Sequence, residues 1–374
     1  MLTTLHPELL DAIQDFPIGL CVLPPPSYDN RPILVVKALK ECILATQLNR
    51  NFKIYLPSLG DDTVVSGLVT AFFDDADEPL VLRSPLFDDK HSRRLVSYLQ
   101  ESELDVHLFD EHTRELLAFR CSVAVPEITK QRLRRMPLGP FSYEFAGQTL
   151  DCMQKWFGKR GPKDDAEAIT IGFEESLMPE NIYLMDLTPK NNGFVGARPF
   201  NTSYLVRKEP GALQEHDIAL LLQRVFPANQ IYKSPLRIND REEIADLLVI
   251  SDTSLIFIQA KDSPNTENAL RNLLERKKAT ARKSLKRALV QTRGAVRYAK
   301  SAEPITLLVD GREVKVPIAD LAWRALIVVK DGACQVSCRL GHAAKGCLSI
   351  LLRCSVTTES RSGLSGACQF SFRH

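Results

Sequence analysis

The stretch EIADLLVISDTSLIFIQAK, residues 243–261, decides the fold of the C-terminal half of the chain. Two apolar runs rich in Ile, Val and Phe flank residues 252–253, and this pattern predicts a β-hairpin. If the turn is centred on these two residues, Asp246 lies opposite Gln259 on the neighbouring strand. Lys261 follows Gln259 by two residues, so its side chain points to the same face of the sheet. The sequence therefore predicts that an acid, an amide and a lysine converge.

This convergence suits the hydrolysis of phosphodiester bonds. An unpaired charge among apolar strand residues would cost roughly several kcal/mol, so the three polar groups need a reason to be there. The Asp246 carboxylate, the Gln259 amide and the Ala260 main-chain carbonyl offer the oxygen ligands that Mg²⁺ or Mn²⁺ prefers. Lys261 is suited to position an attacking water and to offset negative charge in the transition state. We therefore expect a metal-dependent nuclease site.

The segments EIAD and QAK of the hairpin, twelve residues apart, resemble the PD-(D/E)XK nuclease superfamily in its QxK variant, as in Mrr-type restriction endonucleases. The resemblance covers about residues 205–330 and implies an α/β restriction-endonuclease-like core. The family pattern has a proline where Ala245 stands and a second acid where Gln259 stands. It also has an acidic residue in the preceding helix, and Glu215 fits that position.

The resemblance completes the expected site. It implies that Asp246, Gln259 and Glu215 hold the metal ion, and that the same three residues act with Lys261 as the catalytic set. Glu215 is followed by apolar residues at helical spacing, which places it on the buried face of its helix. The alternative is a plain ion pair between Asp246 and Lys261 at a sheet edge, with Gln259 facing solvent.

The elements around the hairpin follow in an order typical of an α/β core. An Asp-Gly pair between two alternating runs predicts a second hairpin. The expected elements are a helix at 212–226, the first hairpin at 243–261, a long basic helix within 268–299, the second hairpin at 305–316 and a strand at 325–329.

The basic helix is the expected contact with nucleic acid. Residues 271–300 contain eleven Lys or Arg and one acid, whereas a solvated helix face usually carries mixed charge. A stripe of Leu, Ala and Val along the same helix is expected to dock on the sheet. The residues expected to contact phosphates of DNA are Arg276, Lys277, Lys278, Arg282, Lys283, Lys286 and Arg287. A merely solvated helix face is the alternative.

Length and charge predict more than one domain. The chain has 374 residues, of which 44% are apolar, enough for two cores. Its net charge of +2 conceals an acidic segment, residues 1–110, whose charge of −8 leaves +10 for the rest of the chain. We predict a recognition or assembly domain at 1–200, the nuclease domain at 201–330, and a loosely ordered tail rich in Cys, Ser and Gly at 331–374.

The N-terminal part is expected to form a separate α+β domain. Helical spacing is read in residues 34–43, and two strand pairs are read in residues 63–86 and 105–121. No catalytic constellation is recognised before residue 200. The role expected of this domain is sensing or assembly, through a homo-oligomer or a protein partner.

Cysteines and histidines are weaker signals. Cys21, Cys42, Cys121 and Cys152 are expected to be reduced residues among apolar neighbours. The five cysteines of the tail have spacing that fits a zinc site poorly, so zinc is not expected as a cofactor. The histidines of the N-terminal half, His6, His91, His107 and His112, are expected to be surface or turn residues.

Together these features predict a Mg²⁺-dependent endonuclease acting on DNA, and the resemblance implies a setting in prokaryotic restriction or antiphage defence. No membrane span and no secretory signal are recognised, so a cytoplasmic location is expected. One alternative is an inactive nuclease-fold protein that binds nucleic acid or serves as an adaptor. Another is that the basic face binds an acidic protein, or the acidic N-terminal segment of the chain itself.

Overall fold

The computed structural model describes residues 1–24, 31–59, 63–301, 303–318, 320–329 and 351–355. These residues form two units. Unit 1 contains Met1–Ile182 and Asn265–Asn272, and unit 2 contains Tyr183–Pro264, 273–329 and 351–355. The chain thus first passes from unit 1 to unit 2 between Ile182 and Tyr183. The sequence predicts this boundary later, near residue 200.

Unit 1 is built on a mixed eight-stranded sheet. Only the β2–β8 pair is parallel among its neighbouring strands. In spatial order the strands are β1 (Gly19–Leu23), β2 (Ile33–Lys37), β8 (Glu103–Phe109), β9 (Glu115–Ala124), β10 (Ile169–Ser176), β3 (Asn51–Tyr55), β6 (Gly67–Phe72) and β7 (Leu80–Pro85). A two-residue pair, β4 (Ser58–Leu59) and β5 (Thr63–Val64), forms a separate ribbon.

Helices complete unit 1. One of them, α9 (Glu267–Leu270), comes from the segment that follows the hairpin of unit 2 in sequence and contacts α3. The others are α1 (Leu2–Leu5), the 3₁₀ turn η1 (Pro7–Leu9), α2 (Leu10–Asp15), α3 (Lys40–Asn49), α4 (Lys90–Tyr98), α5 (Glu127–Arg135), α6 (Tyr143–Phe157) and α7 (Pro162–Glu167).

For unit 1, the predicted strand pairs are confirmed and the predicted helix is partly wrong. Both expected strand pairs are confirmed, as β6 with β7 and as β8 with β9. The helical reading of residues 34–43 is wrong in its first half, where β2 lies. Every residue of β2 is buried, so its apolar residues run on without the alternation that marks a half-exposed strand. Helix α3 begins only at Lys40.

Unit 2 is built on a five-stranded sheet. Its hairpin strands pair antiparallel, and the longer of them, β16, pairs in parallel with β19. In spatial order the strands are β13 (Ile231–Lys233), β15 (Leu247–Ile250), β16 (Ser254–Lys261), β19 (Ala322–Val329) and β20 (Leu351–Ser355). Smaller sheets join β14 (Leu236–Arg237) to β17 (Ile305–Val309) and β18 (Arg312–Val316), and β11 (Tyr183–Asp186) to β12 (Asn201–Tyr204).

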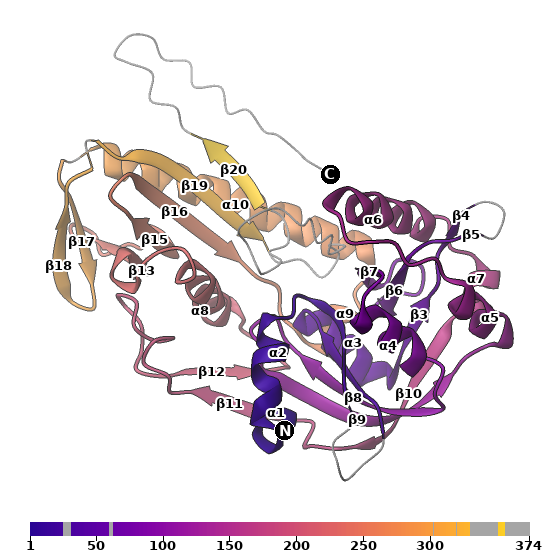
Figure 1. Ribbon diagram of the computed structural model, residues 1–374. Helices are drawn as coiled ribbons and strands as arrows, with labels where there is room; N and C mark the ends of the chain where they lie inside the picture. Colours follow the sequence, from indigo (N-terminus) through magenta and orange to yellow (C-terminus); the bar gives the residue numbers. More distant parts are fainter. Residues whose placement is uncertain (25–30, 60–62, 302, 319, 330–350, 356–374) are drawn as a thin grey trace. The chain divides into compact units, whose positions relative to one another are not determined.

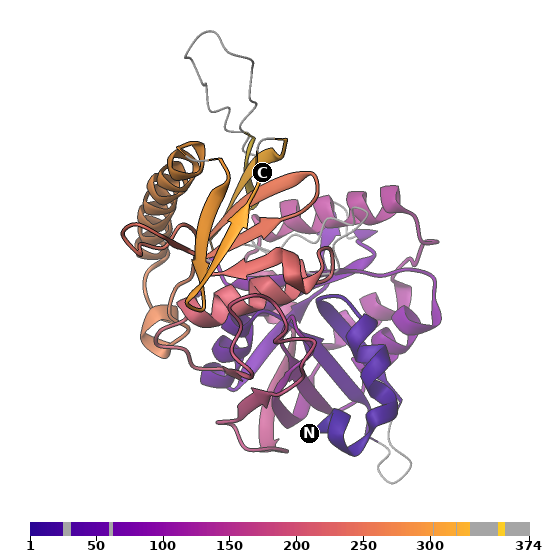
Figure 2. The ribbon, with the colours of Figure 1, turned by 90° about the vertical axis from the view of Figure 1, so that its left-hand side faces the viewer.

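Two helices pack on opposite faces of this five-stranded sheet (Figure 1, Figure 2). Helix α8 (Gly211–Leu222) packs on the face that carries Leu247, Val249 and Ile258. Helix α10 (Leu274–Lys300) packs on the face that carries Leu248 and Phe257. Alternating strand residues thus supply two cores, one on each side of the sheet. A short 3₁₀ turn, η2 (Ala228–Gln230), precedes β13.

Most of the elements predicted for unit 2 are present. The helix, both hairpins and the last strand are confirmed as α8, β15–β16, β17–β18 and β19. Asp310 and Gly311 have φ angles of 50° and 72°, as a tight two-residue hairpin turn requires. The long basic helix expected within residues 268–299 is confirmed as α10, which begins at Leu274, and the residues just before it form the separate short helix α9 of unit 1. A restriction-endonuclease-like core stays a prediction.

The weaker sequence signals also have outcomes. Cys21, Cys42 and Cys121 are buried, as expected of core residues. His107 is wrong as a surface or turn residue, since it is buried on β8 and its Nδ1 lies 2.8 Å from Oε1 of the buried Glu115. The prediction that the tail cysteines form no zinc site concerns side chains that lie outside the described residues. Among the described residues, no helix combines the length and apolar character needed to cross a membrane.

Candidate active site

The hairpin brings Asp246 and Lys261 together. Leu247 pairs with Ile258 and Ile250 with Leu255, so the register is the one expected from a turn at residues 252–253. Asp246 immediately precedes β15, and its Oδ2 accepts hydrogen bonds from the Ala260 backbone N–H at 2.5 Å and from Lys261 Nζ at 3.2 Å. Its side chain is therefore held at the end of β16 where Gln259 and Lys261 lie.

Gln259 is a buried residue with an unsatisfied acceptor. It is 2% exposed, and its Oε1 has no hydrogen-bond partner among the described residues. The structure therefore does not have the solvent-facing glutamine of the ion-pair alternative. Leaving a buried polar atom unpaired costs about 1–3 kcal/mol, so such an atom calls for an explanation. A ligand that accepts electron density from the amide carbonyl would provide one.

Glu215 projects from α8, and burial and the negative charge of Asp246 both contribute to the raised pKa of its carboxyl group. Burial raises the pKa of Glu215 to about 6; Lys233 opposes the rise, and the negative charges of Asp246 and Glu243 add to it. The Lys233 Nζ lies 3.5 Å from Glu215 Oε2. The structure thus brings the acid of the preceding helix into electrostatic range of the hairpin acid.

Glu243 is a site residue that the sequence pattern did not assign. Burial raises its pKa; a hydrogen bond from the Ser234 side chain lowers it, and the charge of Asp246 raises it further. Lys261 and Lys233 act in the opposite direction. The available signal was an acid three residues before Asp246 and next to the buried Ile244 and Ala245, although the Glu243 residue as a whole is exposed.

Gln214, the neighbour of Glu215, is a second residue that sequence reasoning missed. Gln214 is buried on α8, and its Nε2 donates to the Lys261 main-chain carbonyl at 3.5 Å. Its Oε1 has no hydrogen-bond partner among the described residues. The contact ties the end of β16 to α8, which also carries Glu215. No pattern of spacing could have indicated it.

The donor set of this cluster fits a hard divalent cation. Three carboxylates, from Glu215, Glu243 and Asp246, face two ammonium groups, from Lys233 and Lys261. Carboxylate and amide oxygens are what Mg²⁺ or Mn²⁺ takes in proteins. An excess of negative charge and an unsatisfied carbonyl oxygen on Gln259 are both features that a bound cation would relieve.

The basic helix presents its charges away from the sheet. Its buried residues include Ala288, Ala295 and Ala299, so the expected apolar stripe does pack on the strands. One acid lies among the basic residues, where Glu275 pairs with Lys278 at 3.2 Å. Of the residues expected to contact phosphates, Lys277 and Lys278 are half-buried and the other five are exposed: Arg276, Arg282, Lys283, Lys286 and Arg287.

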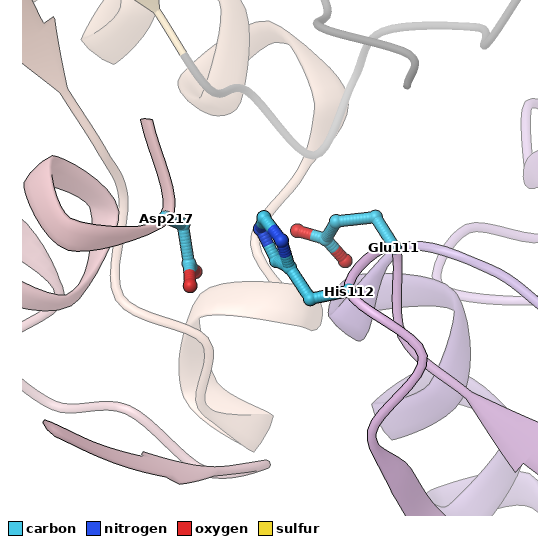
Figure 3. A group of neighbouring side chains, drawn as sticks. All are labelled: Glu111, His112 and Asp217. Atoms are coloured by element: carbon cyan, nitrogen blue, oxygen red, sulfur yellow. The ribbon is translucent and has the colours of Figure 1, made fainter. Parts of the chain in front are cut away.

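Figure 3 shows three further polar side chains, Glu111 and His112 of unit 1 and Asp217 of unit 2. The contacts described here for them lie within their own units. Asp217 of α8 in unit 2 is buried, and its Oδ2 accepts from both Nη atoms of the buried Arg207 at 3.3 Å. Glu111 and His112 of unit 1 stand in the turn between β8 and β9 (Figure 3), where the His112 backbone N–H donates to Asp110 Oδ1 at 3.0 Å. These contacts stabilise a helix and a turn.

Comparison of the chain with known proteins identifies no related family. No protein-family model, no curated protein and no solved structure matches the chain. The functional assignment therefore rests on the residues and their geometry.

Proposed function

We propose that the chain is a Mg²⁺-dependent endonuclease that hydrolyses phosphodiester bonds in DNA. The observation that carries the proposal is the buried Gln259 Oε1, left without a partner among the described residues, beside the Asp246 carboxylate that Lys261 holds in place. A bound Mg²⁺ or Mn²⁺ would polarise the phosphate and acidify a water. The oxygens of Asp246, Gln259 and Glu215 would hold it, with Glu243 as a further candidate.

The chain's own residues have separate tasks in this proposal. Lys261 orients the attacking water and offsets the charge that develops on the phosphate, because its ammonium is fixed by Asp246 rather than by solvent. Gln214 holds the main chain at Lys261 and so limits the movement of that ammonium. The exposed lysines and arginines of α10 bind phosphates along the strand and fix its position on the protein.

The setting is proposed from the sequence resemblance. A nuclease of this pattern suits prokaryotic restriction or antiphage defence and a cytoplasmic location. Unit 1 would then serve as the recognition or assembly module, through a protein partner or a second copy of the chain.

A cleavage assay with supercoiled plasmid tests the proposal. The full chain with Mg²⁺ or Mn²⁺ should nick the plasmid, and Lys261→Ala should not, because the variant lacks the ammonium beside the reacting phosphate. Lys315→Ala is a matched control, since Lys315 is an exposed lysine on β18 outside the site. Equal nicking by the wild type and Lys261→Ala would contradict the assignment of the site.

An inactive nucleic-acid-binding or adaptor protein is the second candidate. It is favoured by one observation: Lys233 and Lys261 already pair with Glu215 and Asp246, so part of the negative charge is compensated without a metal ion. A protein of this kind would bind DNA with the same salt dependence and would not nick plasmid at any Mg²⁺ or Mn²⁺ concentration.

A further inference from the structure

Lys233 is a charged residue of the cluster that the nuclease resemblance does not include. It is the last residue of β13 and pairs with Leu247 of β15, the residue after Asp246. Its Nζ lies 3.3 Å from the Ala212 carbonyl oxygen and 3.5 Å from Glu215 Oε2. The ammonium is thus placed between the first turn of α8 and the carboxylate of Glu215.

Two backbone hydrogen bonds hold the end of β13, which carries this ammonium. The Lys233 N–H donates to the Val195 carbonyl at 2.8 Å, and the next residue, Ser234, donates its N–H to the Asp246 carbonyl at 3.0 Å. Ser234 has a φ of 46°, which a non-glycine residue rarely adopts. The end of β13 is therefore tied by its backbone to Asp246.

The charges divide into two groups. Lys261 pairs with Asp246, next to the unsatisfied oxygen of Gln259. Lys233 pairs with Glu215, whereas Glu243 lies within electrostatic range of Asp246, Lys261 and Lys233. Gln259 thus lies with the Asp246 pair, whereas Glu215 already has a resident cation in Lys233.

We propose that the Lys233 ammonium takes the place of a second divalent cation beside Glu215, so that the oxygens of Asp246, Gln259 and Glu215 together hold a single metal ion. The proposal rests on the proposed function and adds to it the number of ions and the residue that sets it. Lys233 is a positioning residue here, because it acts on Glu215 and Glu243 and not on the substrate. A lysine is suited to this role, since an ammonium provides one fixed charge and three hydrogen-bond donors.

The test is the Mn²⁺ stoichiometry of the full chain, measured by calorimetric titration and by electron paramagnetic resonance of free Mn²⁺. The wild type should bind one Mn²⁺ per chain, and Lys233→Met should bind two, because Glu215 then lacks its ammonium partner and can recruit a second ion. Lys233→Arg and the control Lys315→Met should bind one. Adding Glu215→Gln to Lys233→Met should return the number to one.

Two results would overturn the proposal. A wild type that binds two Mn²⁺ contradicts it directly, even if Lys233→Met does not fold. One Mn²⁺ in folded Lys233→Met, with the affinity of the wild type, contradicts it equally. Failure of the proposed function looks different, because Asp246→Asn would then bind Mn²⁺ as the wild type does, or neither protein would bind any.

Discussion

Two aspartates of this chain, each beside a lysine, differ in how many of their carboxylate oxygens the surrounding residues satisfy. Asp110 of unit 1 is fully buried, and both of its oxygens are used: Oδ1 accepts two backbone N–H groups, and Oδ2 contacts Lys40 Nζ at 3.0 Å and Arg114 Nε at 2.7 Å. Asp246 of unit 2 uses only Oδ2, and no hydrogen bond reaches its Oδ1 among the described residues.

The neighbours of the two aspartates differ as well. Cations surround Asp110, whereas Asp246 has the carboxylates of Glu215 and Glu243 within electrostatic range. A buried charge that is paired on every side needs nothing further, but clustered acids with an unsatisfied amide oxygen gain from a cation. The comparison therefore predicts that changes near Asp110 affect stability and changes near Asp246 affect metal binding and cleavage.

The largest effect on stability is expected at Lys40. Lys40→Met removes one of the two cations of the buried Asp110, so the free energy of unfolding should fall by about 3 kcal/mol. Urea denaturation of the full chain measures it. Lys90→Met, at an exposed lysine of unit 1, should change stability by less than about 0.5 kcal/mol. Equal effects of the two substitutions would remove the structural role assigned to the Asp110 cluster.

The salt dependence of DNA binding tests whether the lysines of α10 contact phosphates. If its lysines contact phosphates, changing Lys277, Lys278, Lys283 and Lys286 to Gln should reduce the slope of log affinity against log salt by about 0.9 for each phosphate that is no longer neutralised. Fluorescence anisotropy at several salt concentrations measures the slope. A slope that does not change would return the helix to the solvated-face interpretation.

Gln259 separates the metal-site interpretation from the ion-pair interpretation. Gln259→Ala should reduce Mg²⁺-dependent nicking by about tenfold or more, because the site loses an oxygen ligand. Gln259→Glu should preserve or raise the rate, since it restores an acid at that position. Nicking rates across a Mg²⁺ titration check both. Wild-type nicking by Gln259→Ala would show that the unsatisfied oxygen has no part in the reaction.

The smallest expected effect is the change in the free energy of unfolding with pH that Glu215 causes. The pKa of Glu215 is raised to about 6 from an ordinary value of 4.5, mainly by burial, so the folded state binds its proton more tightly than the unfolded state does. The resulting stability is present below about pH 4.5 and is lost as pH rises through about 6. Its size is about 1 kcal/mol after solvent screening of a partly exposed group.

Melting temperatures between pH 4 and 7, without divalent ions, measure this loss. Glu215→Gln should flatten the profile because an amide does not titrate. An equal slope in the wild type and the variant would mean that Glu215 titrates normally in the folded protein.

Local patterns predicted much of unit 2 from sequence. The register around Asp246 follows from the length of a two-residue turn, and the Asp310-Gly311 hairpin follows from the positive φ angles its turn requires. These features depend on residues close in sequence, so spacing alone determines them.

The remaining site residues depend on contacts between distant segments. Lys233 reaches the site from the end of β13, where no period marks it. The passage of residues 265–272 into unit 1 also has no local signal: there, Asn265 donates to the Lys40 carbonyl at 3.3 Å. Such contacts are determined by tertiary packing, which overrides local preference.

The central claim is that Asp246 belongs to a metal-dependent active site, and Asp246→Asn tests it most directly. Plasmid nicking should be measured for the wild type and the variant across Mg²⁺ and Mn²⁺ titrations, with melting temperature as the control for folding. We predict that the variant melts close to the wild type, keeps or tightens DNA binding without metal, and nicks plasmid about 100-fold more slowly or not at all. Folded Asp246→Asn that nicks as fast as the wild type would contradict the metal-site assignment and favour the adaptor.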